Sequence, residues 1–181
     1  MILFLIKEVK NMVTLERQNI KENTKRYNKE VKRIRNVIGK DYPINHVGST
    51  ALPYMIGKNI IDILIGVSSD NEMEDLTKKL KQLGFYPGKK SNGNIYRFFA
   101  STEKETKSGD IHIHLVKIDS DRYKDFLILK EYLLINKEER KEYAKLKKEI
   151  LKDGYNIRED YKNIKSKYVT DLLNRARESV K

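Results

Sequence analysis

The sequence contains no cysteine and only three prolines among its 181 residues. The absence of cysteine excludes disulfides, zinc fingers, iron–sulfur ligation and thiol catalysis, and it makes the cytoplasm the expected compartment. The opening apolar run covers only residues 1–6, which is too short for a signal peptide or a membrane span, and we expect no membrane segment elsewhere.

Positive charge is abundant. Lys and Arg number 38 against 26 Asp and Glu, which gives a formal net charge of +12. This balance attracts polyanions such as nucleic acid and nucleotides, although a solvated basic face without a dedicated partner explains it equally well. The length predicts one compact domain, to which we assign residues 14–181, after an N-terminal leader of residues 1–13 without assigned function.

Hydrophobic periodicity predicts an α+β fold with a small sheet first and a helical C-terminal tail second. Helices are expected over residues 14–38, 70–83, 120–135, 137–152 and 158–177, and strands over 44–48, 59–67 and 110–118, with strand, turn and strand across 85–101. Residues 59–67 are apolar on both faces, which is typical of a buried central strand, and Asp62 is the only charge in it.

Gly48, Ser49 and Thr50 follow one predicted strand, and Asp62 lies inside the next. A glycine here lets the backbone approach a phosphate, the serine hydroxyl can bind phosphate oxygens, and the aspartate can hold a divalent cation. These are the minimum parts for placing a nucleoside triphosphate and its metal. An ordinary turn beside an aspartate that accepts backbone hydrogen bonds explains the same residues, and this is the more frequent meaning of the pattern.

Two of the three histidines, His112 and His114, share one face of the last predicted strand with Asp110. We expect these three residues to converge as a metal site or a proton-transfer pair, unless the histidines only hydrogen-bond polar neighbours at the rim of the sheet. Arg97 is the preferred phosphate clamp because its guanidinium binds bidentately, and pairing with Asp110 or Asp62 is its alternative role. No serine lies in a Gly-x-Ser-x-Gly elbow.

The segment NHVGSTALPYMIGKNIIDILIGV, residues 45–67, resembles the signature of the GrpB family, also called UPF0157, which reads like EHVGSTAVPGLAAKPIIDI. Similar segments follow in order at residues 97–99, 111–116 and 129–133, and in two Tyr-x-x-x-Lys pairs, Tyr143 with Lys147 and Tyr161 with Lys165. The resemblance covers roughly residues 44–170. It implies the nucleotidyltransferase fold, a small mixed β-sheet with flanking helices.

The resemblance implies binding of a nucleotide or another phosphorylated ligand and, if the protein is an enzyme, metal-dependent nucleotidyl transfer. In that scheme Gly48 and Ser49 hold phosphate oxygens and Asp62 binds the metal, while His112 or His114 completes the coordination or moves a proton. The other candidate phosphate or nucleotide contacts are Thr50, Lys58, Arg97, Lys130, Lys147 and Lys165.

The sequence departs from the active-site pattern of nucleotidyltransferases, and these departures suggest two alternative functions. An active nucleotidyltransferase typically carries two acids on this strand, D-x-D, whereas Leu64 follows Asp62 at the second position. If His112 and His114 hold the metal, the preferred metal changes from magnesium to manganese or zinc. The alternatives are a non-catalytic nucleotide- or RNA-binding module and a histidine-based, metal-dependent hydrolase.

The loop between the two strands also departs from the family. Tyr54 and Met55 stand where the family has Gly-Leu, and Asn59 stands where it has a proline. We therefore expect this loop to differ in shape.

Overall fold

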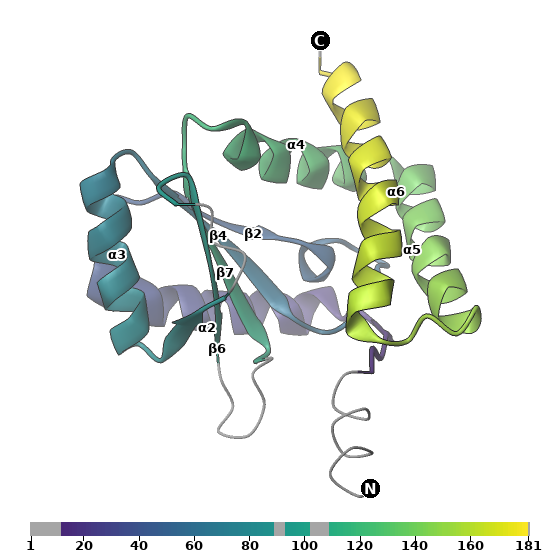
Figure 1. Cartoon of the computed structure of the whole chain (residues 1–181), viewed down its shortest axis with the longest axis horizontal. Coiled ribbons are helices and arrows are strands. Elements are labelled where there is room, and N and C mark those ends of the chain that lie inside the picture. The colour runs from purple at the N-terminus through teal and green to yellow at the C-terminus, as the bar shows by residue number, and fades with distance from the viewer. Residues whose placement is uncertain (1–11, 89–92, 102–108, 181) are drawn as a thin grey trace, which may run out of the picture.

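A computed structural model describes residues 12–88, 93–101 and 109–180 (Figure 1). The strands are β1 (Glu16–Arg17), β2 (Ile44–Val47), β3 (Ile56–Gly57), β4 (Ile61–Val67), β5 (Phe85–Pro87), β6 (Tyr96–Ser101) and β7 (Ile111–Lys117). The helices are α2 (Ile20–Ile38), α3 (Asp70–Gln82), α4 (Asp121–Ile135), α5 (Lys137–Lys152) and α6 (Arg158–Glu178), with a 3-10 helix η1 (Ser49–Ala51) after β2. The predicted α+β fold with a helical C-terminal tail is confirmed.

The main sheet has five strands in the order β2-β4-β7-β6-β5. Strands β4 and β7 are parallel, and the other neighbours are antiparallel. The register places His112 beside Asp62 and His114 beside Leu64. Because side chains alternate along a strand, all four lie on the same face of the sheet.

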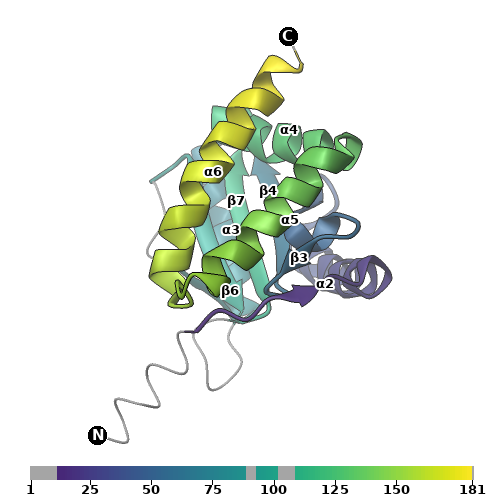
Figure 2. The same cartoon turned by 90° about the vertical axis from the view of Figure 1, so that its right-hand side faces the viewer.

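Helices cover both faces of this sheet (Figures 1 and 2). Helices α2 and α3 pack on one face, where Ile34, Leu76 and Phe99 belong to the largest buried cluster. Helix α4 packs on the other face through Tyr123, which contacts Leu64 and Val116 in a second cluster. Helices α5 and α6 lie beside α4, and this helical group stands over the face that carries Asp62.

The N-terminal helix begins at Ile20, not at residue 14 as the periodicity predicts. Asn19 is its N-cap and accepts a hydrogen bond from the backbone N–H of Glu22. The preceding residues pair as β1 with β3, which takes them out of the helix. Val13 is only 6% exposed and its N–H donates to the carbonyl of Asn156.

The remaining boundaries agree within a few residues. Helix α3 is capped by Ser69, and Gly84 follows it with φ of +85°. Residues 1–11 of the predicted leader, residues 91–92 of the predicted turn and residues 102–108 of the predicted loop lie outside the described residues. No helix in the described segments is both long enough and apolar enough to cross a membrane.

Candidate functional site

The turn after β2 is held directly against Asp62. Antiparallel pairing places Val47 opposite Asp62, so the chain leaves β2 beside the carboxylate. Gly48 has φ of +74°, and a Cβ atom on it would collide with Oδ2 of Asp62. The glycine is therefore required for two reasons, its backbone conformation and its close approach to a carboxylate.

Asp62 accepts hydrogen bonds from both histidines of β7. Its Oδ1 lies 3.2 Å from Nδ1 of His112 and 3.3 Å from Nε2 of His114. Burial raises the pKa of the Asp62 carboxyl, but the hydrogen bonds and charges of the two histidines outweigh burial and hold that pKa well below its usual range. Asp62 is thus an ionised carboxylate inside the fold.

The proton positions around His114 follow from this ionisation. An ionised carboxylate only accepts, so Nε2 of His114 carries a hydrogen and donates to Asp62. Nδ1 of the same ring forms a hydrogen bond with the Tyr96 hydroxyl, whose oxygen lies 3.0 Å away. Tyr96, His114 and Asp62 form a continuous hydrogen-bonded chain along one face of the sheet.

These side chains are not arranged as a metal site of three protein ligands. Nδ1 of His112 and Nε2 of His114 both face Oδ1 of Asp62, and a ring nitrogen that donates a hydrogen bond to this oxygen has no lone pair for a metal. Within the described residues no group of three or more His, Asp or Glu side chains is arranged to hold a metal ion. We derive no step through a metal, and the magnesium, manganese or zinc cofactor stays a prediction of the sequence.

Asp110 does not converge with the histidines, so that expectation is wrong. Its Oδ2 lies 3.0 Å from Nη2 of Arg26, and its Oδ1 accepts a hydrogen bond from Ser101. Strand β7 begins at Ile111, so Asp110 precedes the paired residues and the alternation of the strand does not fix its direction.

Ser49 is in contact with a buried lysine of α5. Nζ of Lys147 lies 2.5 Å from Oγ of Ser49, donates to the carbonyl of Ile56 at 3.0 Å, and lies 4.2 Å from the centre of the Tyr143 ring. Lys147 is 2% exposed. Burial, reinforced by the charge of Lys165, holds the pKa of Lys147 well below its ordinary value, although Asp62 opposes the shift.

Thr50 fixes the turn. Its hydroxyl donates to the carbonyl of Ile60, so Oγ1 of Thr50 accepts from Nε2 of His46 at 3.0 Å. The His46 ring stacks on Tyr27 of α2, with centroids 4.6 Å apart. Burial lowers the pKa of His46 to about 4, so the ring is neutral at physiological pH. The predicted phosphate contact Thr50 is 1% exposed, and its hydroxyl serves the turn.

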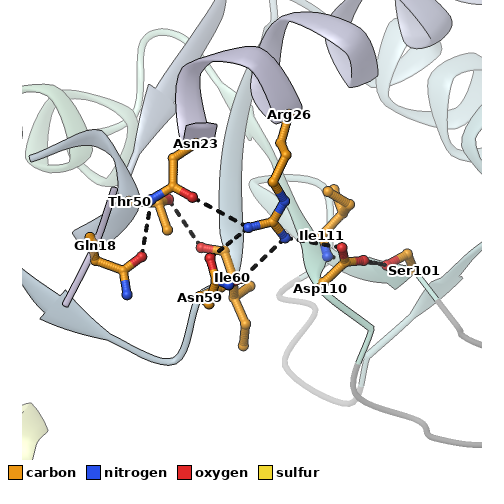
Figure 3. A network of polar contacts seen from close by, with 9 residues as sticks. All are labelled: Gln18, Asn23, Arg26, Thr50, Asn59, Ile60, Ser101, Asp110 and Ile111. Carbon is orange, nitrogen blue, oxygen red and sulfur yellow. Dashed lines mark hydrogen bonds and ion pairs between the residues drawn. The ribbon is translucent and has the colours of Figure 1, made fainter. Parts of the chain in front are cut away.

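A polar network clamps the loop between β3 and β4 (Figure 3). The Arg26 guanidinium of α2 donates to the side-chain oxygen and the carbonyl of Asn59 and to the carboxylate of Asp110. Asn59 has φ of +56°, which a proline cannot adopt. A proline at this position would require a different loop conformation, and the clamp fixes the loop that carries Lys58.

Two cavities open on the Asp62 face. We name the first, of about 360 Å³, the cationic cavity, because its lining includes Lys58, Lys147, Arg158, Lys162 and Lys165 but only two carboxylates, Asp62 and Glu159. We name the second, of about 570 Å³, the apolar cavity, because its lining includes Val47, Leu52, Phe126, Leu129, Leu133 and Val169, together with Arg122 and Lys130. Both cavities are lined by Ser49, Asp62, His114 and Lys165.

Arg97 lies outside both cavities. It pairs with Leu115 in the sheet, on the face covered by α3, where its guanidinium contacts Glu74 and donates to Thr77. The prediction of a phosphate clamp is wrong at Arg97 because strand alternation directs it away from Asp62. Lys130 lines the apolar cavity, 4.0 Å from the carboxylate of its neighbour Glu131.

Sequence reasoning missed several lining residues of the two cavities, among them Tyr96, Arg158 and Lys162. Tyr96 is one position from Arg97, so alternation places it on the Asp62 face. Arg158, Lys162 and Lys165 are spaced i, i+4 and i+7 on α6, which is one face of a helix. The periodicity that identified the helix therefore also identifies its cationic stripe.

The sequence profile of the GrpB protein family matches residues 14–175. The chain belongs to the GrpB family. The glutamate-rich protein GrpB of Alkalihalophilus pseudofirmus is 31% identical over 159 residues, which cover 84% of this chain and 90% of that protein.

Solved structures show the same fold. The crystal structure of the conserved protein GrpB from Enterococcus faecalis superposes with a TM-score of 0.77 at 17% identity, over 92% of this chain and 99% of that chain. The Cid1 poly(U) polymerase, solved with MgGTP, gives a TM-score of 0.50 at 15% identity, over 78% of this chain and 45% of that chain. The GrpB-family chain thus has a nucleotidyltransferase-like fold.

Proposed function

We propose that this GrpB-family protein binds a phosphate-bearing small molecule, with a nucleotide as the first class to test, in the cationic cavity. The observation that carries the proposal is the charge of the lining, in which lysine and arginine side chains outnumber the two carboxylates even without Lys147, whose pKa burial holds well below its ordinary value. Such an excess, partly withdrawn from water, is stabilised by a bound anion.

The carboxylates neutralise only part of this lining. Glu159 pairs with Lys162 at 2.6 Å, and Asp62 is already bound by the two histidines. Within the described part of the chain, neither Arg158 nor Lys165 makes an ion pair. A phosphate group carries the charge and the acceptor oxygens that these two side chains can bind.

A small molecule fits the arrangement better than a polynucleotide. Helix α2, which is rich in lysine and arginine, packs on the opposite face of the sheet from the cavity. A chain bound in the cavity would therefore not meet the basic face of α2. We infer a compact ligand, with RNA as the less favoured partner.

We propose binding rather than nucleotidyl transfer because Asp62 is the only acid on its strand and both histidines engage it. Two-metal transfer needs several carboxylate oxygens facing one point. Ligand binding is accordingly expected without a divalent cation.

Calorimetric titration with ATP, GTP, CTP, UTP and pyrophosphate, with EDTA present, tests the proposal. We expect at least one compound to bind, and Lys165→Gln to weaken that binding at least tenfold, which corresponds to about 1.4 kcal/mol. Lys167→Gln, an exposed lysine two residues away on α6, is the matched control and should bind as the wild type does. The proposal fails if none of the compounds binds or if Lys165→Gln binds with unchanged affinity.

Added magnesium or manganese separates binding from transfer. Binding that requires the metal and disappears in Asp62→Asn would overturn the metal-free form of the proposal and favour nucleotidyl transfer. Binding that is indifferent to the metal supports the proposal as stated.

A further inference from the structure

We propose that Ser49 and Lys147 form a nucleophile and base pair that transfers an apolar acyl group from a phosphate-bearing ester to water. The anionic half of this substrate rests on the proposed function, whereas the chemistry at Ser49 does not. A lysine base replaces the histidine of serine triads, so no Gly-x-Ser-x-Gly elbow is required.

The distance between the two side chains permits direct proton transfer. Nζ of Lys147 and Oγ of Ser49 are 2.5 Å apart, and the carbonyl of Ile56 accepts another hydrogen bond from the same nitrogen. A neutral amine satisfies this geometry because it donates to the carbonyl and directs its lone pair at the serine hydroxyl.

The surroundings of Lys147 favour that neutral amine. The side chain is 2% exposed, and it has no carboxylate partner among the described residues. A buried ammonium without a counter-ion is strongly disfavoured, so burial lowers the pKa of the group and favours the neutral amine. Lys165 and Lys58 add repulsion, whereas Asp62 and the face of the Tyr143 ring act in the opposite direction.

The position of Ser49 indicates the substrate class. Ser49 is partly exposed and lines both the cationic and the apolar cavity. An ester whose carbonyl carbon sits at Ser49 would place its apolar acyl chain among Leu52, Phe126 and Leu129 and its phosphate-bearing alcohol beside Arg158 and Lys162. Lys165 lines both cavities, and its Nζ can donate a hydrogen bond to a developing oxyanion.

The reaction has two steps, formation of an acyl-serine and its hydrolysis. In the first, the proton of the Ser49 hydroxyl passes to Nζ of Lys147 while Oγ bonds to the carbonyl carbon, and the departing alcohol oxygen takes that proton as its C–O bond breaks. In the second, water attacks the acyl-serine and gives a proton to Lys147, which returns it to Oγ as the carboxylic acid leaves. Serine and lysine end in their starting states, and water is the only co-reactant.

Labelling of the full chain with an alkyl fluorophosphonate tests the pair, because this probe phosphonylates nucleophilic serines with loss of fluoride. We expect one adduct by intact mass, mapped to Ser49, and none in Ser49→Ala. Lys147→Arg replaces the amine with a guanidinium cation, which provides no base because guanidinium does not deprotonate in proteins. Its labelling rate should fall at least a hundredfold, within the range of general-base catalysis.

Lys148→Arg, the exposed neighbour on α5, is the matched control and should label at the wild-type rate. A wild-type chain that does not label, an adduct elsewhere than Ser49, or unchanged labelling of folded Lys147→Arg would each overturn the proposal. If Lys147→Arg does not fold, the pH dependence in the wild type decides. The rate should rise with a single ionisation below the ordinary lysine range, and a rate independent of pH would contradict the lysine base.

The two proposals fail separately. Nucleotide binding without labelling removes the Ser49 chemistry and leaves the anion site. Labelling without nucleotide binding supports the nucleophile and removes the proposed anionic ligand.

Discussion

Arg97 and Asp62 lie on opposite faces of the five-stranded sheet. Arg97 is paired in register with Leu115, whereas Asp62 is paired with His112, and neighbouring positions in a strand alternate between the two faces. One face therefore carries the hydrogen-bonded carboxylate and the two cavities, and the other joins β6 to α3. The separation assigns different roles to two residues that the sequence alone associates with one phosphate.

Substitution of Arg97 should affect stability and leave ligand affinity unchanged. Arg97→Gln removes the contacts with Glu74 and Thr77, and because Glu74 is largely exposed we expect a loss of about 1 kcal/mol in the free energy of unfolding. Urea unfolding measures this change, and titration of the same variant with the bound phosphate compound should give the wild-type dissociation constant. Weakened binding in a folded Arg97→Gln would place the anion site elsewhere than the Asp62 face.

Gly48→Ala should be far more disruptive than Gly39→Ala. Both glycines have positive φ, but a Cβ at Gly39 meets nothing within 4 Å, whereas a Cβ at Gly48 collides with the Asp62 carboxylate. Strain at positive φ alone costs about 1–2 kcal/mol, and overpacking adds about 1–3 kcal/mol. Thermal and urea unfolding measure the loss of stability in each variant. The difference between the two losses is the cost of the collision between the added Cβ and Asp62. Equal losses would mean that the turn moves freely away from Asp62.

The protein should lose stability between about pH 6.5 and pH 4 because of His46. The folded state holds the pKa of His46 near 4, below the value of 6.5 in an unfolded chain. The unfolded state therefore binds more protons in this interval, and the free energy of unfolding falls as pH falls, by at most about 3 kcal/mol.

Urea unfolding at several pH values measures this dependence. His46→Gln should flatten the curve between pH 6.5 and pH 4. The loss expected from Asp62 lies lower, since its depressed pKa contributes stability that disappears only as pH falls below the ordinary aspartate value. An unchanged slope in His46→Gln would contradict the assignment.

Tyr54 and Asn59, the two non-glycine residues with positive φ in the described part of the chain, should respond oppositely to substitution by glycine. Tyr54 has φ of +58° and is 72% exposed, so Tyr54→Gly relieves backbone strain and should leave the free energy of unfolding unchanged or raise it by up to about 1 kcal/mol. Asn59→Gly removes the 2.6 Å hydrogen bond from Arg26 and should cost about 1 kcal/mol. Differential scanning calorimetry of both variants makes the comparison, and a larger loss in Tyr54→Gly than in Asn59→Gly would refute it.

Much of the fold follows from local pattern. The doubly apolar strand that contains Asp62, the alternation of His112 and His114, and the helical stripes of the C-terminal half each depend on residues close together in the chain. For this reason the predicted elements agree with the structure within a few residues. The N-terminal helix is the exception, because β1 pairs with β3 about forty positions away and local periodicity carries no information about that pairing.

Part of the candidate site also follows from local pattern, and part of it depends on the tertiary structure. Gly48, Ser49 and Asp62 are identified in the sequence by the turn and strand that hold them, and the GrpB resemblance is carried by the same segment. Where each charged side chain points depends on strand register and on which helix covers which face. Strand register separates Arg97 from Asp62 and places Tyr96 on the Asp62 face, whereas Asp110 lies before β7 and is held by Arg26 and Ser101.

The sequence by itself determined the order of the elements, the family and the residues at the turn beside Asp62, because these depend on local periodicity and on a contiguous motif. Only the tertiary structure decided that Lys147 of α5 reaches Ser49 and that α6 closes the cationic cavity. Those contacts join positions almost a hundred residues apart. They are set by how the helices pack on the sheet, and burial in that packing lowers the pKa of Lys147 well below the ordinary value of a lysine.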